Sequence, residues 1–243
     1  MQGVIVLDDQ FSRSRLIFKQ SELDKIFASN IAVFGIGGVG SWCIEALVRA
    51  GVSNISLFDG DTVSISNLNR QLIALHSTIG QLKPEVMKRR ILSINPNANV
   101  ICHSVFYTTE NSAEFDLSKF DYVIDAIDMV SSKIELIVQA KKCRTPIISS
   151  MGTGNKLSGS KFEISDIYKT SVCPLARVMR HELRKRGIDS LKVLYSKEEP
   201  VSVQCGNLSG KSVPGSVSFV PPVAGMLIAG EVIRDISGVN KEL

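Results

Sequence analysis

The sequence has no apolar stretch long enough to cross a membrane, and its amino-terminal end lacks the pattern of a secretory signal. The most apolar stretch, Val217–Ile236, is interrupted by two prolines and by charged Glu231 and Arg234. Residues 1–20 carry two acidic residues and no cleavable apolar core. These absences argue against a membrane protein and a secreted protein, so we expect a cytoplasmic one.

Cysteine is scarce and scattered. The five cysteines are isolated and odd in number, which argues against a disulfide framework and against a zinc site built from CxxC pairs. A GxxxxGK[ST] loop is also missing, which disfavours an ordinary P-loop nucleoside triphosphatase. The remaining composition, 44% hydrophobic and 21% charged with a net charge of +4, is ordinary for a folded globular chain.

The chain is organised around a strand that runs directly into a glycine-rich turn and then a helix, at residues 31–51. Gly35, Gly37 and Gly40 have the spacing at which a strand turns tightly into a helix, with Gly38 between them. Backbone N–H groups can then approach a phosphate at the positive end of the helix. Ser41 can add a hydroxyl to this site.

The next predicted strand, at residues 55–58, stops at Asp59. This acid follows the glycine turn by about 20 residues, where a dinucleotide-binding unit places its ribose-binding carboxylate. On these residues alone, an NAD-linked dehydrogenase is as good an interpretation as any other nucleotide-binding protein.

Strands and helices continue to alternate along the chain, which predicts a doubly wound, mainly parallel α/β sheet with its ligands at the carboxyl ends of the strands. Further strands are predicted at 100–105, 122–128, 146–149, 192–195 and 215–220. Helices are predicted at 21–27, 85–95, 131–142, 174–186 and 224–236.

Polar side chains gather at the predicted strand ends and in the loops after them: Asp59, Asn67, Arg70, Lys83 and Asp128. Backbone donors satisfy the pyrophosphate of a dinucleotide. A triphosphate attacked at phosphorus also needs cations for its phosphates and a carboxylate for magnesium. Arg70 and Lys83 suit the first task and Asp128 the second, so this set favours ATP and Mg²⁺ over NAD.

In order along the chain, the motifs GxGGxGS, DxD, SNLNRQ, GxxK and DxxD resemble the ubiquitin-activating-enzyme-like superfamily of adenylyltransferases. The resemblance extends from about residue 11 to residue 236. It implies one adenylyltransferase domain with a Rossmann-like sheet that a C-terminal extension completes. The implied parts are an arm and helix (1–29), a nucleotide-binding core (30–150) and a substrate-side extension (151–243).

The resemblance also implies roles for single residues. Asp59 would bind the ribose, Arg70 and Lys83 the phosphates with support from Asn67, and Asp128 the magnesium. Arg13 matches an arginine that reaches into the active site of the other subunit of a homodimer, so it joins Arg70, Lys83 and Asp128 as an implied catalytic residue. On the residues alone, Arg13 is a solvated surface residue.

Within the superfamily, members that activate sulfur-carrier proteins usually carry the CxxC pairs that are missing here. Residues 168–176, the basic helix after them, and residues 215–221 resemble the branch that acts on threonylcarbamoyladenosine in tRNA. That branch adenylates the threonyl carboxylate of a nucleoside next to the anticodon and then closes it into a ring. Cys173 stands where many of these relatives have an aspartate.

A dense group of basic residues on the predicted helix 174–186 supports a tRNA partner independently, because phosphate contacts require such a face. The group consists of Arg177, Arg180, Arg184, Lys185 and Arg186, with His181 among them. The alternative is an ordinary solvated basic helix.

Cys205 lies in a glycine-flanked loop from which a thiol could reach an activated acyl group. Ring closure needs no enzyme thioester, since its nucleophile is already tethered in the substrate. Two alternative functions stay open: activation of a ubiquitin-like or sulfur-carrier protein, and a non-catalytic ATP-binding partner. The sequence also leaves open whether a cysteine desulfurase or sulfur-acceptor protein docks on this one.

Overall fold

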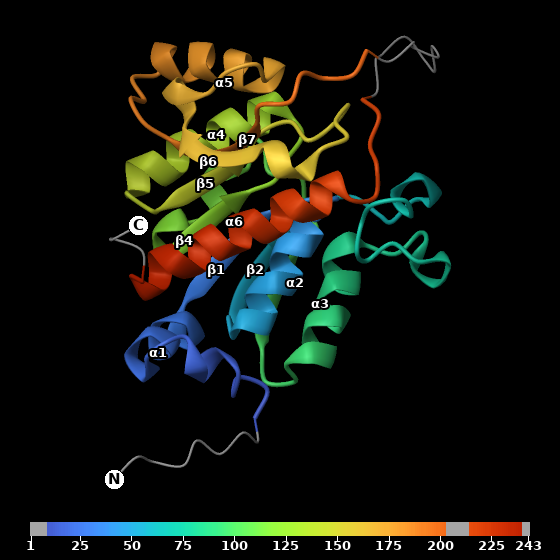
Figure 1. Cartoon of the computed structure of the whole chain (residues 1–243), viewed down its shortest axis with the longest axis vertical. Helices are drawn as coiled ribbons and strands as arrows, with labels where there is room; N and C mark the ends of the chain where they lie inside the picture. Colours follow the sequence, from blue (N-terminus) through green and yellow to red (C-terminus); the bar gives the residue numbers. More distant parts are fainter. Residues whose placement is uncertain (1–8, 203–213, 240–243) are drawn as a thin grey trace.

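A seven-stranded sheet with the strand order β3-β2-β1-β4-β5-β7-β6 forms the centre of the molecule (Figure 1). The computed structural model describes residues 9–202 and 214–239. All neighbouring strands are parallel except β6 and β7, which are antiparallel. The strands are β1 (Asn30–Phe34), β2 (Asn54–Phe58), β3 (Asn99–His103), β4 (Tyr122–Asp125), β5 (Ile147–Ser150), β6 (Phe162–Asp166) and β7 (Lys192–Ser196).

Helices cover both faces of this sheet. They are α1 (Gln20–Ala28), α2 (Gly40–Ala50), α3 (Lys83–Ile94), α4 (Val130–Cys143), α5 (Pro174–Lys185) and α6 (Val220–Ser237). Side chains of α1, α2, α3 and α6 form one apolar core with the sheet, and those of α4 and α5 form a second core on the other face. Among the described residues, no helix combines the length and the hydropathy that a bilayer span needs.

The predicted doubly wound, mainly parallel sheet is confirmed, and β6 and β7 from the C-terminal part complete it beside β5. The predicted strand at 215–220 is wrong, because α6 begins at Val220. Pro221 and Pro222 lie in its first turn, where the N–H that proline lacks would have no helical partner. The predicted strand at 122–128 is too long: β4 ends at Asp125, and Asp128 lies on the loop that follows.

Asp125 and Lys133 form an ion pair inside the protein, with 2.9 Å between Lys133 Nζ and Asp125 Oδ2 and no exposed surface on either side chain. Lys133 Nζ also donates to the carbonyl oxygens of Ile127, at 3.0 Å, and Ser150, at 2.8 Å. The Asp125 carboxylate accepts from Ile127 N and from Ser149 Oγ. The pair therefore ties the loop after β4 to α4 and to the end of β5.

We expect Lys133→Met to lower the free energy of unfolding by about 3–5 kcal/mol, because it leaves a buried carboxylate without its counter-charge. Lys142→Met is the matched control, since Lys142 is exposed on the same helix; it should change stability by less than about 0.5 kcal/mol. Urea denaturation of both variants measures the difference. If the two variants have the same free energy of unfolding, the ion pair between Asp125 and Lys133 does not stabilise the fold.

Candidate active site

A cleft of about 650 Å³ opens at the carboxyl ends of β2, β1, β4 and β5. The strand order reverses between β1 and β4, the place where doubly wound sheets bind their ligands. Eight of the predicted site residues line this cleft: Gly35, Gly37, Gly38, Asp59, Asn67, Arg70, Lys83 and Asp128. Residues that are far apart in the sequence are thus brought to one cavity.

The glycine turn needs glycine for two reasons: backbone segments pack closely against it, and a ligand must be able to approach its backbone. Gly35 has a φ of +88°, and a Cβ on it would lie 2.5 Å from the carbonyl oxygen of Ala126. A Cβ on Gly40 would overlap the carbonyl oxygen of Gly35, so Gly40 lets the start of α2 approach the end of β1. Gly37 has open space: the nearest atom, on Gln71, would be 3.9 Å away. Gly37 therefore faces the cleft, whereas Gly40 serves packing.

Ser41 does not line the cleft. It is buried, and its hydroxyl donates to the carbonyl oxygen of Gly37 at 2.7 Å and accepts from Leu72 N at 3.2 Å. The first bond lies within the glycine turn, and the second joins that turn to the loop that carries Arg70. The structure thus gives this hydroxyl a role in holding the turn, outside the cavity that the sequence prediction assigned to it.

Asp59 and Lys83 are buried together at the β2 side of the cleft. The Asp59 carboxylate accepts from Ile36 N, at 2.6 Å, and from Asp61 N, at 2.8 Å. Lys83 Nζ lies 2.7 Å from Asp61 Oδ2 and 3.9 Å from Asp59 Oδ1. Burial raises the pKa of Asp59, and the neighbouring Lys83 charge opposes that rise. The Lys83 charge is therefore largely neutralised by its two carboxylate neighbours.

Arg70 has no such counter-charge. Its guanidinium donates to the carbonyl oxygen of Ser66, at 3.0 Å, and to Asn69 Oδ1, at 2.9 Å, and no described carboxylate lies within ion-pair distance. Asn67 shapes this loop: its Oδ1 accepts from Ser64 N, and its carbonyl oxygen accepts from Arg70 N. Arg70 therefore presents an unneutralised cation to the cleft.

Asp128 is exposed on the loop after β4 and lines the cleft. Its carboxylate forms no hydrogen bond or ion pair with the described residues. A carboxylate held at the cleft without a protein partner is available to a ligand or a cation.

The cleft also contains Gln71 and Lys156, which the sequence analysis missed, and Cys173, which it named without assigning it to the site. Gln71 is 7% exposed, and its Oε1 has no hydrogen-bond partner in the described part of the chain. A buried polar atom without a partner is rare, and at the cleft a bound ligand or a water can supply the missing hydrogen bond. Gln71 directly follows Arg70 in the SNLNRQ motif, so the motif itself contained a signal for it.

Arg13 lies outside the cleft of its own chain. It is exposed and precedes the short turn Ser14–Leu16. Phe11 in the same segment packs near Gly51, which follows α2 and precedes β2, at the amino end of the sheet. The cleft is at the opposite, carboxyl end. Cys205 lies outside the described residues.

The basic residues of α5 differ in their surroundings. Arg180 turns inward and donates to the carbonyl oxygen of Thr170, at 3.1 Å, and to the Thr170 hydroxyl. The Arg184 guanidinium lies 4.9 Å from the centre of the Tyr168 ring. Exposed Arg177 has no side-chain partner among the described residues.

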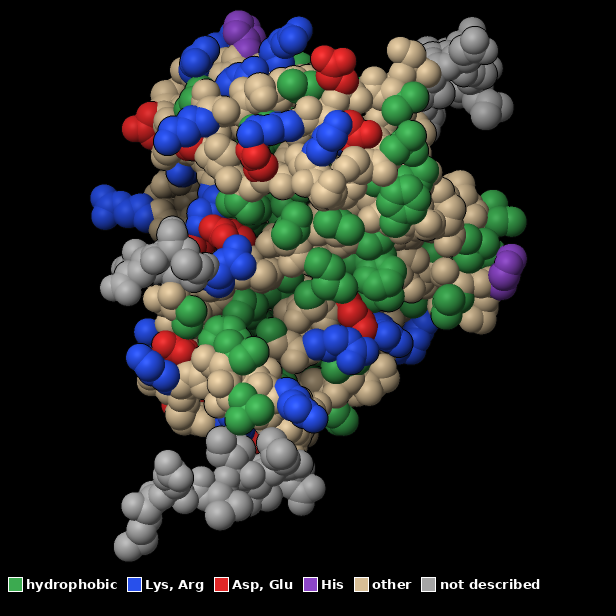
Figure 2. Space-filling model, in the orientation of Figure 1, with side chains coloured by type: hydrophobic (Ala, Val, Ile, Leu, Met, Phe, Trp, Pro, Cys, Tyr) green, Lys and Arg blue, Asp and Glu red, His purple; other side chains and the backbone are tan. Residues whose placement is uncertain are grey.

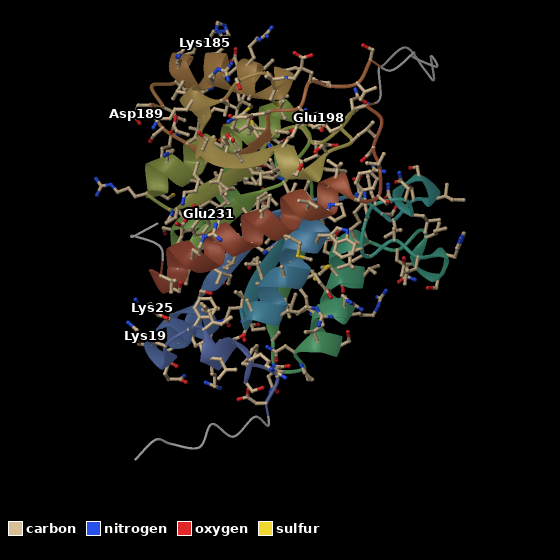
Figure 3. All side chains as sticks on the ribbon, in the orientation of Figure 1. Lys19, Lys25, Lys185, Asp189, Glu198 and Glu231 are labelled. Atoms are coloured by element: carbon tan, nitrogen blue, oxygen red, sulfur yellow. The ribbon has the colours of Figure 1, made fainter. Side chains whose placement is uncertain are left out.

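Lys185 and Arg186 both pair with Glu182, at 2.9 Å and 2.7 Å. Their hydrogen bonds lower the pKa of Glu182 to about 2. Figure 2 shows Lys and Arg side chains gathered over α5 with acidic side chains between them, and in Figure 3 Lys185 lies on the outward side of this helix. The α5 face is therefore basic but partly neutralised.

A glycine turn at the switch point of a doubly wound sheet, with two cations and a free carboxylate around it, defines a nucleotide-binding protein. The model of the ThiF family matches residues 11–243, and the chain belongs to this family.

The chain is 44% identical to a tRNA threonylcarbamoyladenosine dehydratase of Bacillus subtilis, over 93% of this chain and 94% of the relative. It is 37% identical to the Escherichia coli protein of that name, over 75% of this chain and 69% of that protein. A crystal structure of the E. coli protein superposes with a TM-score of 0.87 at 30% identity, covering 97% of this chain and 98% of the other. A complex of that protein with ATP gives a TM-score of 0.86 at 30% identity and 98% coverage of both chains.

We expect Gly40→Ala to destabilise the protein by about 1–3 kcal/mol or more, because the new methyl group overlaps backbone that cannot move without separating α2 from β1. Gly37→Ala, in the same turn, has room for its methyl group and should unfold at nearly the temperature of the unchanged protein. Thermal unfolding of both variants is the measurement. A Gly37→Ala protein that unfolds as early as Gly40→Ala would contradict the described packing.

Proposed function

We propose that this protein is an ATP-dependent tRNA threonylcarbamoyladenosine dehydratase. The observation that carries the proposal is the cleft, in which Asp59, Arg70, Lys83 and Asp128 surround the glycine turn. The Bacillus subtilis relative of this name matches 93% of the chain, and the structure of the E. coli protein in complex with ATP superposes on 98% of it. The enzyme adenylates the threonyl carboxylate of the modified nucleoside and closes it into a ring.

ATP binds with its ribose at Asp59 and its phosphates at the glycine turn. Asp59 is fixed by two backbone N–H groups, so its carboxylate is oriented before the ribose arrives. The N–H groups at the start of α2 suit a phosphate. Arg70 supplies a cation without a counter-charge, and Lys83 supplies one that Asp61 holds in place.

These residues can hold a magnesium ion only together with the bound nucleotide. Mg²⁺ is usually held by one or two carboxylates together with substrate phosphates and water. Asp128 offers one free carboxylate, and the described residues contain no cluster of three or more metal-binding side chains. Asp128 would therefore hold the ion together with ATP, and the ion would neutralise charge on the phosphates.

The reaction then needs two displacements. An oxygen of the threonyl carboxylate attacks the α-phosphorus of ATP, and pyrophosphate leaves with the electron pair of the broken P–O bond. The tethered nucleophile of the substrate next attacks the acyl carbonyl, loses its proton and expels AMP. Arg70 and Lys83 stabilise the charge that develops at phosphorus. Because the nucleophile is tethered, the Cys205 thiol is not required.

We also propose that the enzyme works as a homodimer. Phe219, Val223, Met226 and Leu227 are exposed along α6, and Figure 2 shows hydrophobic side chains gathered across this face. Exposed apolar patches of this kind mark interaction surfaces. Arg13 does not line the cleft of its own chain, so its predicted catalytic role requires the cleft of a second copy.

Enzyme, ATP, magnesium and tRNA bearing threonylcarbamoyladenosine should yield a nucleoside lighter by one water, with AMP and pyrophosphate released. Asp128→Asn should lower this turnover by a factor on the order of hundreds, as expected when developing charge loses its metal. Its unfolding temperature should not change, because Asp128 is exposed and has no partner among the described residues. Mass spectrometry of the nucleosides and calorimetry of the protein measure these two effects.

The outcomes separate the alternatives. Absence of the dehydrated nucleoside would reject the tRNA assignment; pyrophosphate exchange stimulated by a small carrier protein would then support a protein-activating enzyme. ATP binding without any turnover would favour a non-catalytic partner. Normal turnover by Asp128→Asn would remove Asp128 from the site.

For tRNA binding, we expect Arg177→Glu to weaken affinity and to reduce the slope of log affinity against log salt by about one, because exposed Arg177 is free to contact a phosphate. Arg180→Ala should instead lower the unfolding temperature, because it removes the bonds to Thr170. Filter binding over a salt series and thermal unfolding distinguish the two. An unchanged salt slope for Arg177→Glu would leave α5 an ordinary solvated helix.

A further inference from the structure

A second cation without a counter-charge, Lys156, lies in the cleft. It belongs to the segment between β5 and β6, is 3% exposed, and lines the cleft together with Cys173. Its Nζ donates to the carbonyl oxygen of Glu198 at 2.7 Å. No carboxylate of the described residues lies within ion-pair distance of it. A buried ammonium that has no carboxylate within ion-pair distance favours an anionic ligand.

Lys156 is held firmly in this position. The Glu198 carboxylate accepts from Leu157 N and Ser158 N, each at 2.9 Å, while the Glu198 carbonyl accepts from Lys156. Glu198, labelled in Figure 3, therefore binds both the lysine ammonium and the two residues that directly follow Lys156. One N–H group of the ammonium is used, and its other N–H groups have no acceptor among the described residues. Burial lowers the pKa of Lys156, and the nearby Cys173 and Glu198 side chains partly oppose that shift.

The strand order places Lys156 relative to the nucleotide. Asp59 follows β2, the glycine turn follows β1, Asp128 follows β4, and the segment with Lys156 follows β5. These strands are neighbours in the order β2-β1-β4-β5, so Lys156 lies beyond Asp128, on the side away from the ribose site. The N-terminal residues of α5, Cys173 to Leu175, line the cleft there as well and add the positive end of a helix.

Two candidate anions fit poorly at this position. The phosphates of ATP belong near the glycine turn and Arg70, on the other side of Asp128. The backbone phosphates of tRNA are too bulky to reach an ammonium that is 3% exposed. A carboxylate on a slender side group can enter the cleft and reach it.

We propose that Lys156 binds the carboxylate of the acyl substrate and thereby orients it for attack on the α-phosphate. This inference rests on the proposed function, since it names the residue that recognises the anionic group of that substrate. It assigns Lys156 to substrate recognition, separate from the cations that bind the nucleotide.

Lys156→Met, which keeps the length of the side chain and removes its charge, tests the inference. The KM for the modified tRNA should rise roughly tenfold to a hundredfold, as expected for a lost charge-assisted hydrogen bond, with the KM for ATP within about twofold. Lys156→Arg should recover much of the loss. Lys161→Met is the matched control, because Lys161 is exposed nearby and should leave both values unchanged.

A binding measurement tests the same point without turnover. By calorimetry, the unchanged protein with bound AMP should bind free threonylcarbamoyladenosine roughly tenfold more tightly than its methyl ester. Lys156→Met should bind the acid and the ester equally. Its unfolding temperature shows whether the variant is folded; if it is not, Lys156→Gln replaces it in both assays.

The two proposals can fail separately. If the unchanged enzyme forms no dehydrated nucleoside, the proposed function fails, whatever Lys156 does. If it forms the product and Lys156→Met keeps a normal KM for tRNA, or if its KM for ATP rises instead, the inference about Lys156 is overturned while the function stands. Equal binding of acid and ester by the unchanged protein would also overturn it.

Discussion

The buried ion pair between Asp125 and Lys133 fixes the wall of the cleft on which the rest of the site depends. Through Ile127 and Ser150 it ties the loop after β4 to α4 and to the end of β5. The Ala126 carbonyl in that loop packs against Gly35, so the same loop backs the glycine turn. Replacing either partner alone would leave a buried charge, so the pair helps to hold the loop that carries Asp128 against α4 and β5.

The charges of the cleft are distributed so that two anions can bind in it. Lys83 is neutralised by Asp61 and Asp59, whereas Arg70 and Lys156 have no counter-charge among the described residues. Asp128 lies between these two unneutralised cations in the strand order. A triphosphate at Arg70 and a substrate carboxylate at Lys156 match this arrangement. The two ligands would meet near Asp128, the side chain proposed to hold a metal ion.

Most of the fold could be predicted from the sequence, because apolar runs and helical periodicity are local signals. The errors fell where local signals are ambiguous. Residues 122–128 read as one strand, but the carboxylate of Asp125 turns inward to Lys133 and ends β4 there. Residues 215–220 alternate like a strand, yet the two prolines after them start a helix. The partner of Asp125 lies on α4, outside the predicted strand, whereas the prolines that decide the second outcome directly follow residues 215–220.

The sequence by itself determined the family, the sheet and the residues that gather around the glycine turn, because motif order and spacing carry that information. Only the tertiary structure decided which of these side chains are available to a ligand. It turned Arg180 inward to Thr170, used the Ser41 hydroxyl inside the turn, and buried Lys156 in the cleft. The physical reason is that burial and pairing of a side chain depend on segments distant in the sequence, which no local pattern contains.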